Sequence, residues 1–445
     1  MANDSSSSRP AYPDSASWSA RLFERAKRVL PGGSTRQTVT FDPYPIYAVS
    51  GRGCTVTDAD GVERIDFINN YSSMIHGHCH PKIIEALQRQ AEKLIAVGAP
   101  TESEIVLAEL LVGRLPSVEQ LRFCNSGSEA AMIAIQAARA FTGRPKIAKI
   151  EGAYHGGYDA VQVSLKPSPD AWGEPDPAPV AYAAGMPATV VRDTVVLSLN
   201  DIERSRRNLE RHKAELAGVI FDPIVGRMAF LEAKAEYVAF LREWTRANGV
   251  LLILDEVFSF RIDFHGAQGR YKVAPDITAL GKIIGGGIAI GAVGGKKDVM
   301  AVFDGSAGYP RLPHHGTYNA NPLAMAAGLV SMELLDAAAI ARINALGDRL
   351  RDGLNRVFRD ADVPAKAQGV GSMVAIAPAA DFTDYRGLAR APNIDALLVR
   401  IHQGLLNRGV LMMPRGAFVV STPMTEKEID RSVSAVTECV TGVLR

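Results

Sequence analysis

Short apolar segments alternate with helix-like segments through the middle of the chain. The apolar segments include LRFC, KIAKI, GVIFDPI and GVLLILDEV, and between them lie stretches with apolar residues at helical spacing, such as SGSEAAMIAIQAARAFTG. Alternation of this kind is typical of a parallel sheet flanked by helices. The sequence therefore predicts an α/β fold with a large domain built on a mostly parallel sheet.

The two ends of the chain have a different texture. A helix-like segment runs from Ser17 to Leu30, and alternating apolar and polar residues from Tyr47 to Ile68 predict a small antiparallel meander. Beyond a helical pattern that starts near Asn321, helices and short strands give an α+β texture. We therefore expect a flexible tail, an N-terminal segment of a small domain, the large domain and the C-terminal part of the same small α+β domain, at residues 1–16, 17–75, 76–325 and 326–445.

Charge and composition disfavour several classes of partner. The chain has 49 basic and 48 acidic side chains, a net charge of +1, so no global field attracts it to nucleic acid or to an anionic membrane. No stretch reaches the ~18 consecutive apolar residues of a membrane span, and the polar N-terminus lacks the apolar core of a signal peptide. We expect a cytoplasmic protein that binds small molecules, and neither nucleic acid nor a membrane as partner.

The first motif with chemical content is Asn125-Ser126-Gly127-Ser128-Glu129, which precedes a helix-like segment. Glycine beside hydroxyl groups at a helix N-terminus presents free backbone N–H groups and the positive end of the helix dipole, which suits a phosphate. Ser126 and Glu129 also form the S-x-x-E pattern of a capping box, which needs no ligand. Taken alone, the motif favours the cap.

Two charged residues interrupt apolar segments. Asp255 ends a run from Gly249 to Leu254, at the expected carboxyl edge of a buried strand, where open sheets bind ligands. It needs a partner such as a protonated pyridine nitrogen, although it could also cap a helix or hold a metal with Glu256. Lys282 stands among apolar and glycine residues. A lysine removed from water has a lowered pKa, and its neutral amine is a nucleophile toward aldehydes. The alternative is a lysine whose amine reaches solvent, as most lysines do.

These three features occur in the order needed to hold the phosphate, the ring nitrogen and the aldehyde of pyridoxal phosphate. From about Arg25 to its C-terminus, the chain resembles the class III, fold type I, pyridoxal-phosphate-dependent aminotransferases. The matching pieces are PGGS, GHCHP, NSGSEA, GAYHG, LLILDEV, PDITALGKIIGGG and HGTYNANP.

The resemblance implies a homodimer with active sites at the subunit interface, and it implies a role for each matching residue. Lys282 forms the covalent link to the cofactor aldehyde and acts as the catalytic base, and Asp255 pairs with the pyridinium nitrogen. Tyr154 stacks on the ring and Val257 packs on its opposite face. The implied phosphate contacts are Ser126, Gly127, Ser128 and, reaching the phosphate of the neighbouring subunit, Thr317.

Two arginines bear on the substrate. Arg415 is flanked by apolar residues, which predicts a guanidinium that binds a partly buried carboxylate, although either Arg36 or Arg415 could be an ordinary surface arginine. Within the family, the chain most resembles the aromatic β-amino acid (β-phenylalanine) aminotransferases, a branch of the ω-transaminases. This implies that Arg36 binds the β-amino acid and Arg415 the α-carboxylate of the keto acid, with Tyr71 and Met74 as pocket walls.

The implied reaction is ping-pong transfer of an amino group from a β-amino acid, such as β-phenylalanine, to a 2-oxo acid, pyruvate or 2-oxoglutarate. The alternative is the related glutamate-1-semialdehyde 2,1-aminomutase, which shares the PGG loop and moves the amine within one molecule. A silent ligand-binding protein on this scaffold and a nicotinamide-dependent dehydrogenase are more remote, and the dehydrogenase lacks its G-x-G-x-x-G fingerprint.

Two further features bear on the expected site. His76, His78 and His80 alternate in HGHCH, but this piece matches a structural turn of the family and no nearby carboxylate completes a site, so we expect no metal. Where many relatives have glutamate before proline, this chain has Asp222 before Pro223, which puts details of that wall of the pocket in question.

Overall fold

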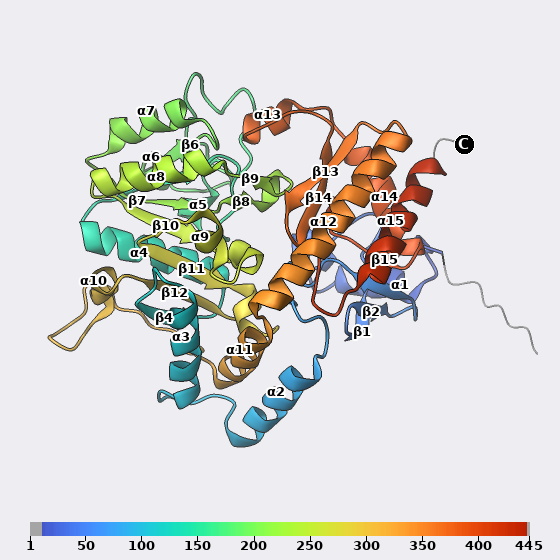
Figure 1. The fold of residues 1–445 in the computed structure, drawn as a ribbon, viewed down its shortest axis with the longest axis horizontal. Helices are drawn as coiled ribbons and strands as arrows, with labels where there is room; N and C mark the ends of the chain where they lie inside the picture. Colours follow the sequence, from blue (N-terminus) through green and yellow to red (C-terminus); the bar gives the residue numbers. More distant parts are fainter. Residues whose placement is uncertain (1–10, 443–445) are drawn as a thin grey trace, which may run out of the picture.

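The computed structural model describes residues 11–442, and its larger part is built on a seven-stranded sheet in the order β4-β12-β11-β10-β7-β5-β6 (Figure 1). The strands are Gln120–Cys124 (β4), Lys146–Ile150 (β5), Thr194–Leu197 (β6), Leu216–Phe221 (β7), Leu251–Asp255 (β10), Ile277–Gly281 (β11) and Gly291–Gly295 (β12). The strands β7, β10 and β11 are buried along their whole length, which explains their continuous apolar runs.

Helices flank this sheet (Figure 1). They are Pro81–Lys93 (α2), Glu102–Arg114 (α3), Gly127–Thr142 (α4), Asp159–Gln162 (α5), Ala188–Arg192 (α6), Ile202–His212 (α7), Ala235–Ala247 (α8), Gly266–Tyr271 (α9), Lys297–Met300 (α10) and Pro322–Leu334 (α11). A small antiparallel pair, Ile224–Val225 (β8) and Leu231–Glu232 (β9), follows β7. The predicted α/β architecture, a mostly parallel sheet flanked by helices, is confirmed.

The strand β12 is the exception to parallel pairing, because it runs antiparallel to both β11 and β4. Its sequence, GAVGG, gave no strand signal, since glycine is depleted in strands. Close packing explains the glycines. A Cβ at Gly291 would collide with the Ser126 carbonyl oxygen, and one at Gly295 would collide with the carbonyl oxygen of Asp276.

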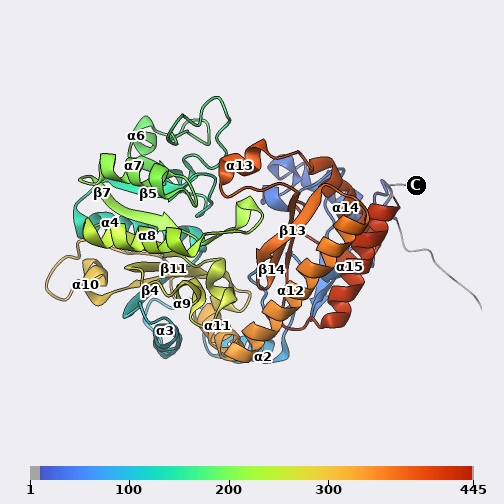
Figure 2. The same ribbon diagram turned by 45° about the horizontal axis from the view of Figure 1, so that its top comes forward.

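The smaller part joins the two ends of the chain. The predicted meander is present as Ala48–Arg52 (β1), Thr55–Asp58 (β2) and Glu63–Asp66 (β3), and the C-terminal strand Val410–Leu411 (β15) pairs parallel with β3. A second sheet contains Ala365–Val370 (β13), Met373–Pro378 (β14) and Ala417–Val419 (β16). The helices of this part are Trp18–Ala26 (α1), Ala337–Asp360 (α12), Tyr385–Arg390 (α13), Asp395–Asn407 (α14) and Glu426–Thr441 (α15). Helix α15 packs between α12 and α14 (Figure 2).

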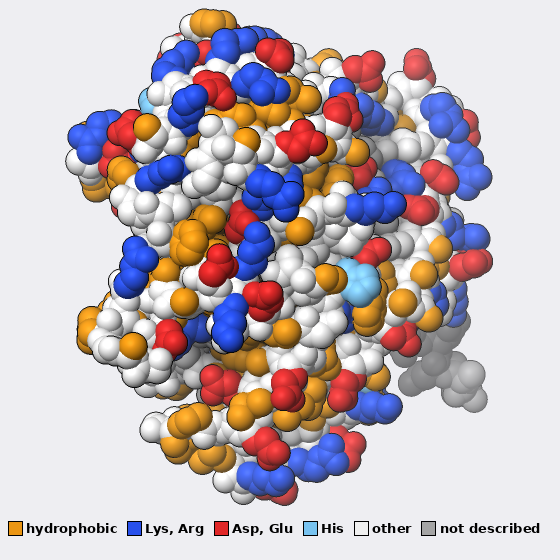
Figure 3. Space-filling view, turned by 60° about the vertical axis from the view of Figure 1, so that its left-hand side comes forward, with side chains coloured by type: hydrophobic (Ala, Val, Ile, Leu, Met, Phe, Trp, Pro, Cys, Tyr) orange, Lys and Arg blue, Asp and Glu red, His pale blue; other side chains and the backbone are white. Residues whose placement is uncertain are grey.

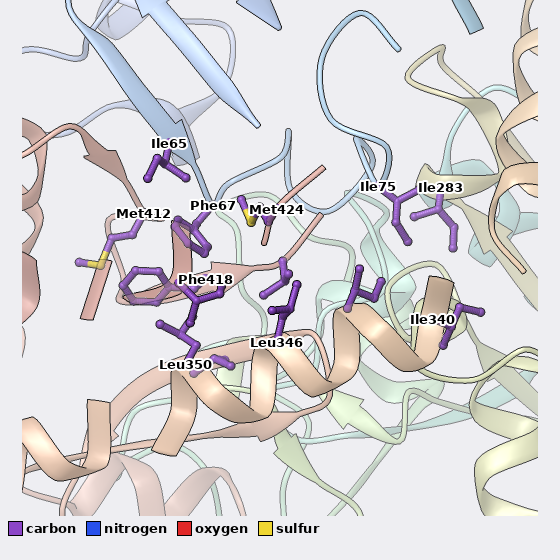
Figure 4. Close-up of a cluster of buried hydrophobic side chains, with 14 of the residues drawn as sticks. Ile65, Phe67, Ile75, Ile283, Ile340, Leu346, Leu350, Met412, Phe418 and Met424 are labelled. Atoms are coloured by element: carbon purple, nitrogen blue, oxygen red, sulfur yellow. The ribbon is translucent and has the colours of Figure 1, made fainter. Parts of the chain in front are cut away.

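A shared hydrophobic cluster holds the N- and C-terminal segments together (Figure 4). The rings of Phe67 and Phe418 meet edge to face with centroids 5.4 Å apart, and both are fully buried. Leu346 and Leu350 of α12 belong to the same cluster, as does Ile283, which directly follows Lys282. Burial of each such side chain contributes roughly 1.5–3 kcal/mol, so the core that joins the two chain ends also supports the segment carrying Lys282.

Two predicted boundaries differ from the structure. Residues 1–10 of the predicted flexible tail lie outside the described residues, but Tyr12, also within that tail, is only 7% exposed and donates a hydrogen bond to the Tyr44 carbonyl oxygen at 2.6 Å. The predicted boundary between residues 325 and 326 falls inside α11, which packs against α2 and α3 of the large part. The chain turns at Leu335 and Asp336 before α12 begins.

The surface in Figure 3 shows acidic and basic side chains interspersed over one face of the molecule, in keeping with a net charge of +1. Within residues 11–442, no single helix has the length and apolarity needed to cross a membrane. The pair α11 and α12, bent by 75°, meets those criteria of length and composition only when taken together.

Candidate active site

Asp255 and Asp222 lie side by side at the carboxyl edge of the sheet, because Leu254 of β10 is in register with Phe221 of β7. Asp255 is buried and accepts two hydrogen bonds, from His155 Nδ1 at 2.7 Å and from the Val257 N–H at 3.0 Å. The position of Asp255 agrees with the prediction that it ends a buried strand.

His155 is a site residue that sequence reasoning missed, although it stands in the motif GAYHG. Its ring is buried, and its Nε2 atom has no hydrogen-bond partner among the described residues. Only the fold brings His155 to Asp255, 100 residues further along the chain. The histidine orients the Asp255 carboxylate through a charge-assisted hydrogen bond.

Asp222 is also buried and accepts a hydrogen bond from the Ile224 N–H at 3.0 Å. Burial raises the pKa of Asp222 well above its usual range, and the negative charge of Asp255 raises it further. Two adjacent buried carboxyl groups do not both ionise readily. The pair therefore favours a protonated Asp222.

Lys282 follows β11 directly and has a left-handed backbone conformation, with φ of 51°. This conformation is strained for a non-glycine residue and costs roughly 1–3 kcal/mol, and such strain is common at functional sites. Its amine lies 4.9 Å from the centroid of the Phe258 ring. Burial lowers the pKa of Lys282, while the carboxylates of Asp255 and Asp222 act in the opposite direction. A reactive amine near two acids is thus placed where the sequence predicted it.

The N-terminus of α4 is capped and also leaves backbone N–H groups free for an anion, so its structure is consistent with both the cap and the phosphate site. Ser126 Oγ accepts a hydrogen bond from the Glu129 N–H at 3.1 Å, and the Glu129 carboxylate accepts one from the Asn125 N–H, so the cap is formed. The N–H groups of Gly127 and Ser128 are in the first turn and have no intrahelical partner, which leaves them available to an anion. The hydroxyl of Ser128 accepts a hydrogen bond from the Gly157 N–H at 3.1 Å.

Val257, predicted to pack on the ring, and the loop that carries Thr317, predicted to contact a neighbouring subunit, lie at the N-terminus of α4. Val257 touches Gly127 so closely that a Cβ there would be 2.6 Å from Val257 Cγ1. Tyr154 is 50% exposed. Thr317 is exposed in the loop that reaches Asn125 through the side chain of Asn319, at 2.9 Å. The contact of Thr317 with a neighbouring subunit stays a prediction.

Arg36 and Arg415 come from opposite ends of the chain and both lie near Tyr71. Arg36 donates to Asn70 Oδ1 at 2.7 Å, and the Tyr71 hydroxyl donates to the Thr38 carbonyl oxygen. Burial raises the pKa of the Tyr71 phenol, whereas the positive charges of Arg36 and Arg415 lower it. Both guanidinium groups are therefore close enough to Tyr71 to interact with it. The structure therefore brings together three of the four predicted substrate residues.

Met74, the fourth, packs against the loop that follows Lys282, because a Cβ at Gly287 would lie 2.9 Å from its sulfur. Arg415 is more exposed than its apolar neighbours in sequence predicted. Its apolar neighbours Met413 and Phe418 are buried, but Arg415 itself is exposed at the tip of the turn in which the Met413 N–H donates to the Ala417 carbonyl oxygen. The apolar flanks support the turn and do not enclose the guanidinium.

The segment that carries Tyr71 is strained. Four consecutive non-glycine residues, Asn69, Asn70, Tyr71 and Ser72, have positive φ angles of 49°, 47°, 56° and 76°. Asn69 anchors this segment by donating from Nδ2 to the Val419 carbonyl oxygen at 2.7 Å. A conformation of this cost persists only where the surroundings hold it, which is typical of ligand-binding segments.

Two histidines of HGHCH, His76 and His78, have structural partners. His76 contacts Thr422 Oγ1 at 3.0 Å and the Ser331 carbonyl oxygen at 2.8 Å. His78 Nε2 lies 2.8 Å from Asp66, because β3 brings this carboxylate back to the turn. Among the described residues, no group of three or more His, Cys, Asp or Glu side chains has the arrangement of a metal site.

Arg227 is a second residue that sequence patterns did not single out. It lies on the short helix Gly226–Met228 (η3) after β8, it is half-buried, and it is close enough to Arg415 for the two charges to interact. No sequence motif marks Arg227, because the residues that it lies near, such as Arg415, are far away along the chain.

The residues around Asp255 and Lys282 fit pyridoxal phosphate. The charges of Asp255 and Lys282 are close enough to interact, and Gly281, which precedes Lys282, packs against Gly127 at the N-terminus of α4. Asp255, this helix N-terminus and Lys282 therefore lie close together, beside the unpartnered His155 Nε2 atom. These groups match the ring nitrogen, the phosphate and the aldehyde of the cofactor.

Comparison with known proteins agrees with this arrangement. The family model described as aminotransferase class-III matches residues 37–440. A curated relative, the glutamate-1-semialdehyde 2,1-aminomutase of Methanothermobacter thermautotrophicus, is 36% identical over 96% of this chain and 99% of its own. The solved structure of an omega-transaminase from Sphaerobacter thermophilus has a TM-score of 0.94 and 46% identity, over 98% of this chain and 99% of that one.

A β-phenylalanine aminotransferase from Variovorax paradoxus also matches, with a TM-score of 0.86 and 34% identity over 95% of this chain and 94% of that one. The predicted resemblance, the fold type I architecture and the assignment as an aminotransferase are thereby confirmed. The chain belongs to the class-III aminotransferase family.

Proposed function

We propose that this aminotransferase moves an amino group from a β-amino acid, such as β-phenylalanine, to a 2-oxo acid by a ping-pong mechanism, with pyridoxal phosphate as its cofactor. The observation that carries the proposal is the placement of Arg36 and Arg415 near Tyr71. Two guanidinium groups from separate segments suit two substrates whose carboxylates lie at different distances from the reacting carbon. An aminomutase, which handles one molecule, needs only one such group.

When bound, pyridoxal phosphate supplies an electron-withdrawing ring that accepts negative charge from the carbon bearing the amino group. In the proposed mechanism, Lys282 Nζ would hold the cofactor aldehyde until a substrate amine displaces it. The freed amine would then accept the proton from that carbon and later give it up again. Asp255 keeps the ring nitrogen protonated, and His155 orients the Asp255 carboxylate. Removing one partner from a buried ion pair costs roughly 3–5 kcal/mol, so Asp255 is indispensable in this mechanism.

The phosphate is proposed to bind the N–H groups of Gly127 and Ser128, with Ser126 at the helix cap and Thr317 donated by a neighbouring subunit. Val257 and Tyr154 are proposed to pack on the two faces of the ring, and Met74 beside Tyr71 to line the substrate pocket.

The proposed contact from Thr317 requires a homodimer. Tyr318 and Tyr309 lie in the same loop and are 62% and 85% exposed in the single chain, and exposed apolar surface of this kind marks interaction sites. Light scattering after size-exclusion chromatography should give the mass of a dimer. A monomer that retains full turnover would contradict the intersubunit contact.

The aminomutase reaction is the second candidate, because relatives with that name are 36% and 38% identical over 96% and 94% of this chain. The purified enzyme should be tested with β-phenylalanine plus pyruvate or 2-oxoglutarate, and in parallel with glutamate-1-semialdehyde alone. We expect transfer in the first assay, and its loss in Lys282→Ala. Isomerisation of the semialdehyde without any transfer from β-phenylalanine would overturn the proposal.

A further inference from the structure

Arg227 is held in a fixed position near the candidate site. The helix η3 is anchored by Gln368 of β13, whose Nε2 donates to the carbonyl oxygens of Met228 at 3.3 Å and Ala229 at 3.0 Å. Ala229 ends the turn in a left-handed conformation, with φ of 54°. The backbone of Arg227 is thus fixed by the small part of the molecule.

The neighbours of η3 connect it to the GAYHG motif. A Cβ at Gly152 would collide with the ring of Tyr385 and would lie 3.0 Å from Met228 Cε, so η3 and α13 both pack on this glycine. Tyr154, predicted to stack on the cofactor, is two residues further along the chain. Arg227 therefore lies close to the segment that carries Tyr154.

The Arg227 guanidinium has no anionic partner among the residues that the structure describes. Within residues 11–442 it forms neither an ion pair nor a side-chain hydrogen bond, although it is half-buried. Glu151, which also acts on Tyr385, is already bound by Arg386 at 2.7 Å and 3.1 Å. A partly buried cation without a partner loses solvation and gains nothing in return, so a bound anion would stabilise it.

The charged and polar groups that shift the pKa of Arg227 are another cation and three phenols. Burial lowers the pKa of Arg227, the positive charge of Arg415 lowers it further, and the phenols of Tyr182, Tyr385 and Tyr154 act in the opposite direction. Arg415 also acts on Tyr71, next to Arg36. Arg415 therefore has Tyr71 and Arg227 among its neighbours, and Tyr71 is also close to Arg36.

We propose that the amino acceptor of this enzyme is a dicarboxylate 2-oxo acid, with its α-carboxylate on Arg415 and its distal carboxylate on Arg227. This inference rests on the proposed function, which leaves the acceptor open between a mono- and a dicarboxylate. Arg36 is less suited to the distal carboxylate, because it already donates to Asn70 Oδ1. A dianion neutralises both Arg227 and Arg415, whereas a monocarboxylate leaves one of two neighbouring cations unpaired.

The test uses acids that cannot react, so that it does not depend on turnover. Calorimetry on the holoenzyme compares glutarate with pentanoate, which has the same number of carbons and one carboxylate. We expect tighter binding of glutarate, by a factor on the order of 10 to 100 for one charge-assisted hydrogen bond. Arg227→Gln should abolish this preference, and Arg227→Lys should retain part of it because the charge remains.

The matched control is Arg246→Gln, which removes an exposed arginine on α8 and should leave the preference unchanged. Steady-state assays should agree, with Arg227→Gln raising KM for 2-oxoglutarate much more than for pyruvate. The inference would be overturned if the wild type bound glutarate and pentanoate equally. It would also be overturned if Arg227→Gln kept the preference for glutarate or lost affinity for both acids to the same extent. A glutarate preference in an enzyme that does not accept β-phenylalanine would overturn only the proposed donor.

Discussion

Replacing Gly127 with alanine tests the geometry at the N-terminus of α4. An added Cβ would lie 2.6 Å from Val257 Cγ1 and 2.9 Å from Cγ2. Carbon atoms in ordinary contact are about 3.5–4.0 Å apart, so α4 or Val257 must move by roughly 1 Å. Val257 has little freedom, because its N–H donates to Asp255 at 3.0 Å and its branched side chain is restricted in χ1.

Overpacking of this kind typically costs about 1–3 kcal/mol. The strain falls on the residues proposed to hold the cofactor phosphate and one face of its ring. We therefore expect the dissociation constant of pyridoxal phosphate to rise about 5- to 150-fold, since each 1.4 kcal/mol is a factor of ten. Absorbance titration of the cofactor-free protein measures this constant directly.

Two further variants separate steric strain from other effects. Gly157→Ala is the matched control, because a Cβ there has nothing within 4 Å, and it should bind the cofactor as the wild type does. Adding Val257→Ala to Gly127→Ala removes the colliding methyl groups, so Gly127→Ala should cost much less affinity in the Val257→Ala background than in the wild type. Unchanged affinity in Gly127→Ala, or an equal cost in the two backgrounds, would refute the steric reasoning.

Three other predictions concern single side chains. Lys282→Ala should lose both the absorbance of the covalent link between lysine and cofactor and turnover, and retention of both would contradict its proposed role. Arg415→Ala should raise KM for the 2-oxo acid roughly 10-fold or more through loss of a charge-assisted hydrogen bond, and an unchanged KM would exclude that contact. Burial lowers the pKa of His76 from 6.5 to about 4, so its contribution to stability, about 3 kcal/mol, is present above pH ~6.5 and is lost as the pH falls toward ~4. In His76→Asn, the free energy of unfolding measured across that window should therefore fall less steeply with acidification.

Local patterns in the sequence located much of the candidate site. Asp255 ends a fully apolar run, and Lys282 follows another, so each could be placed at the end of a buried strand from its neighbours alone. The S-x-x-E pattern at Ser126 likewise predicted the start of α4. Such features depend on residues within a few positions of one another, which periodicity and capping rules describe.

Other features could not be read from neighbouring residues. The strand β12 is hidden by its glycines, which are required by carbonyl oxygens from distant segments. Arg415 is exposed because it lies at the tip of a turn, although apolar residues surround it in sequence. Tyr12 is buried because it meets Tyr44 and α14, whereas its own serine-rich surroundings predicted a flexible tail.

The sequence by itself determined the α/β class, the strand ends that carry Asp255 and Lys282, and the helix N-terminus at Gly127. The tertiary structure decided which of these groups meet and what else joins them: His155 on Asp255, Asp222 beside it, and Arg227 near Arg415. The physical reason is that helix and strand formation is governed by local spacing, whereas strand order and packing bring together side chains that lie far apart along the chain. The proposed role of Arg227 depends on its nearness to Arg415, which only the fold establishes.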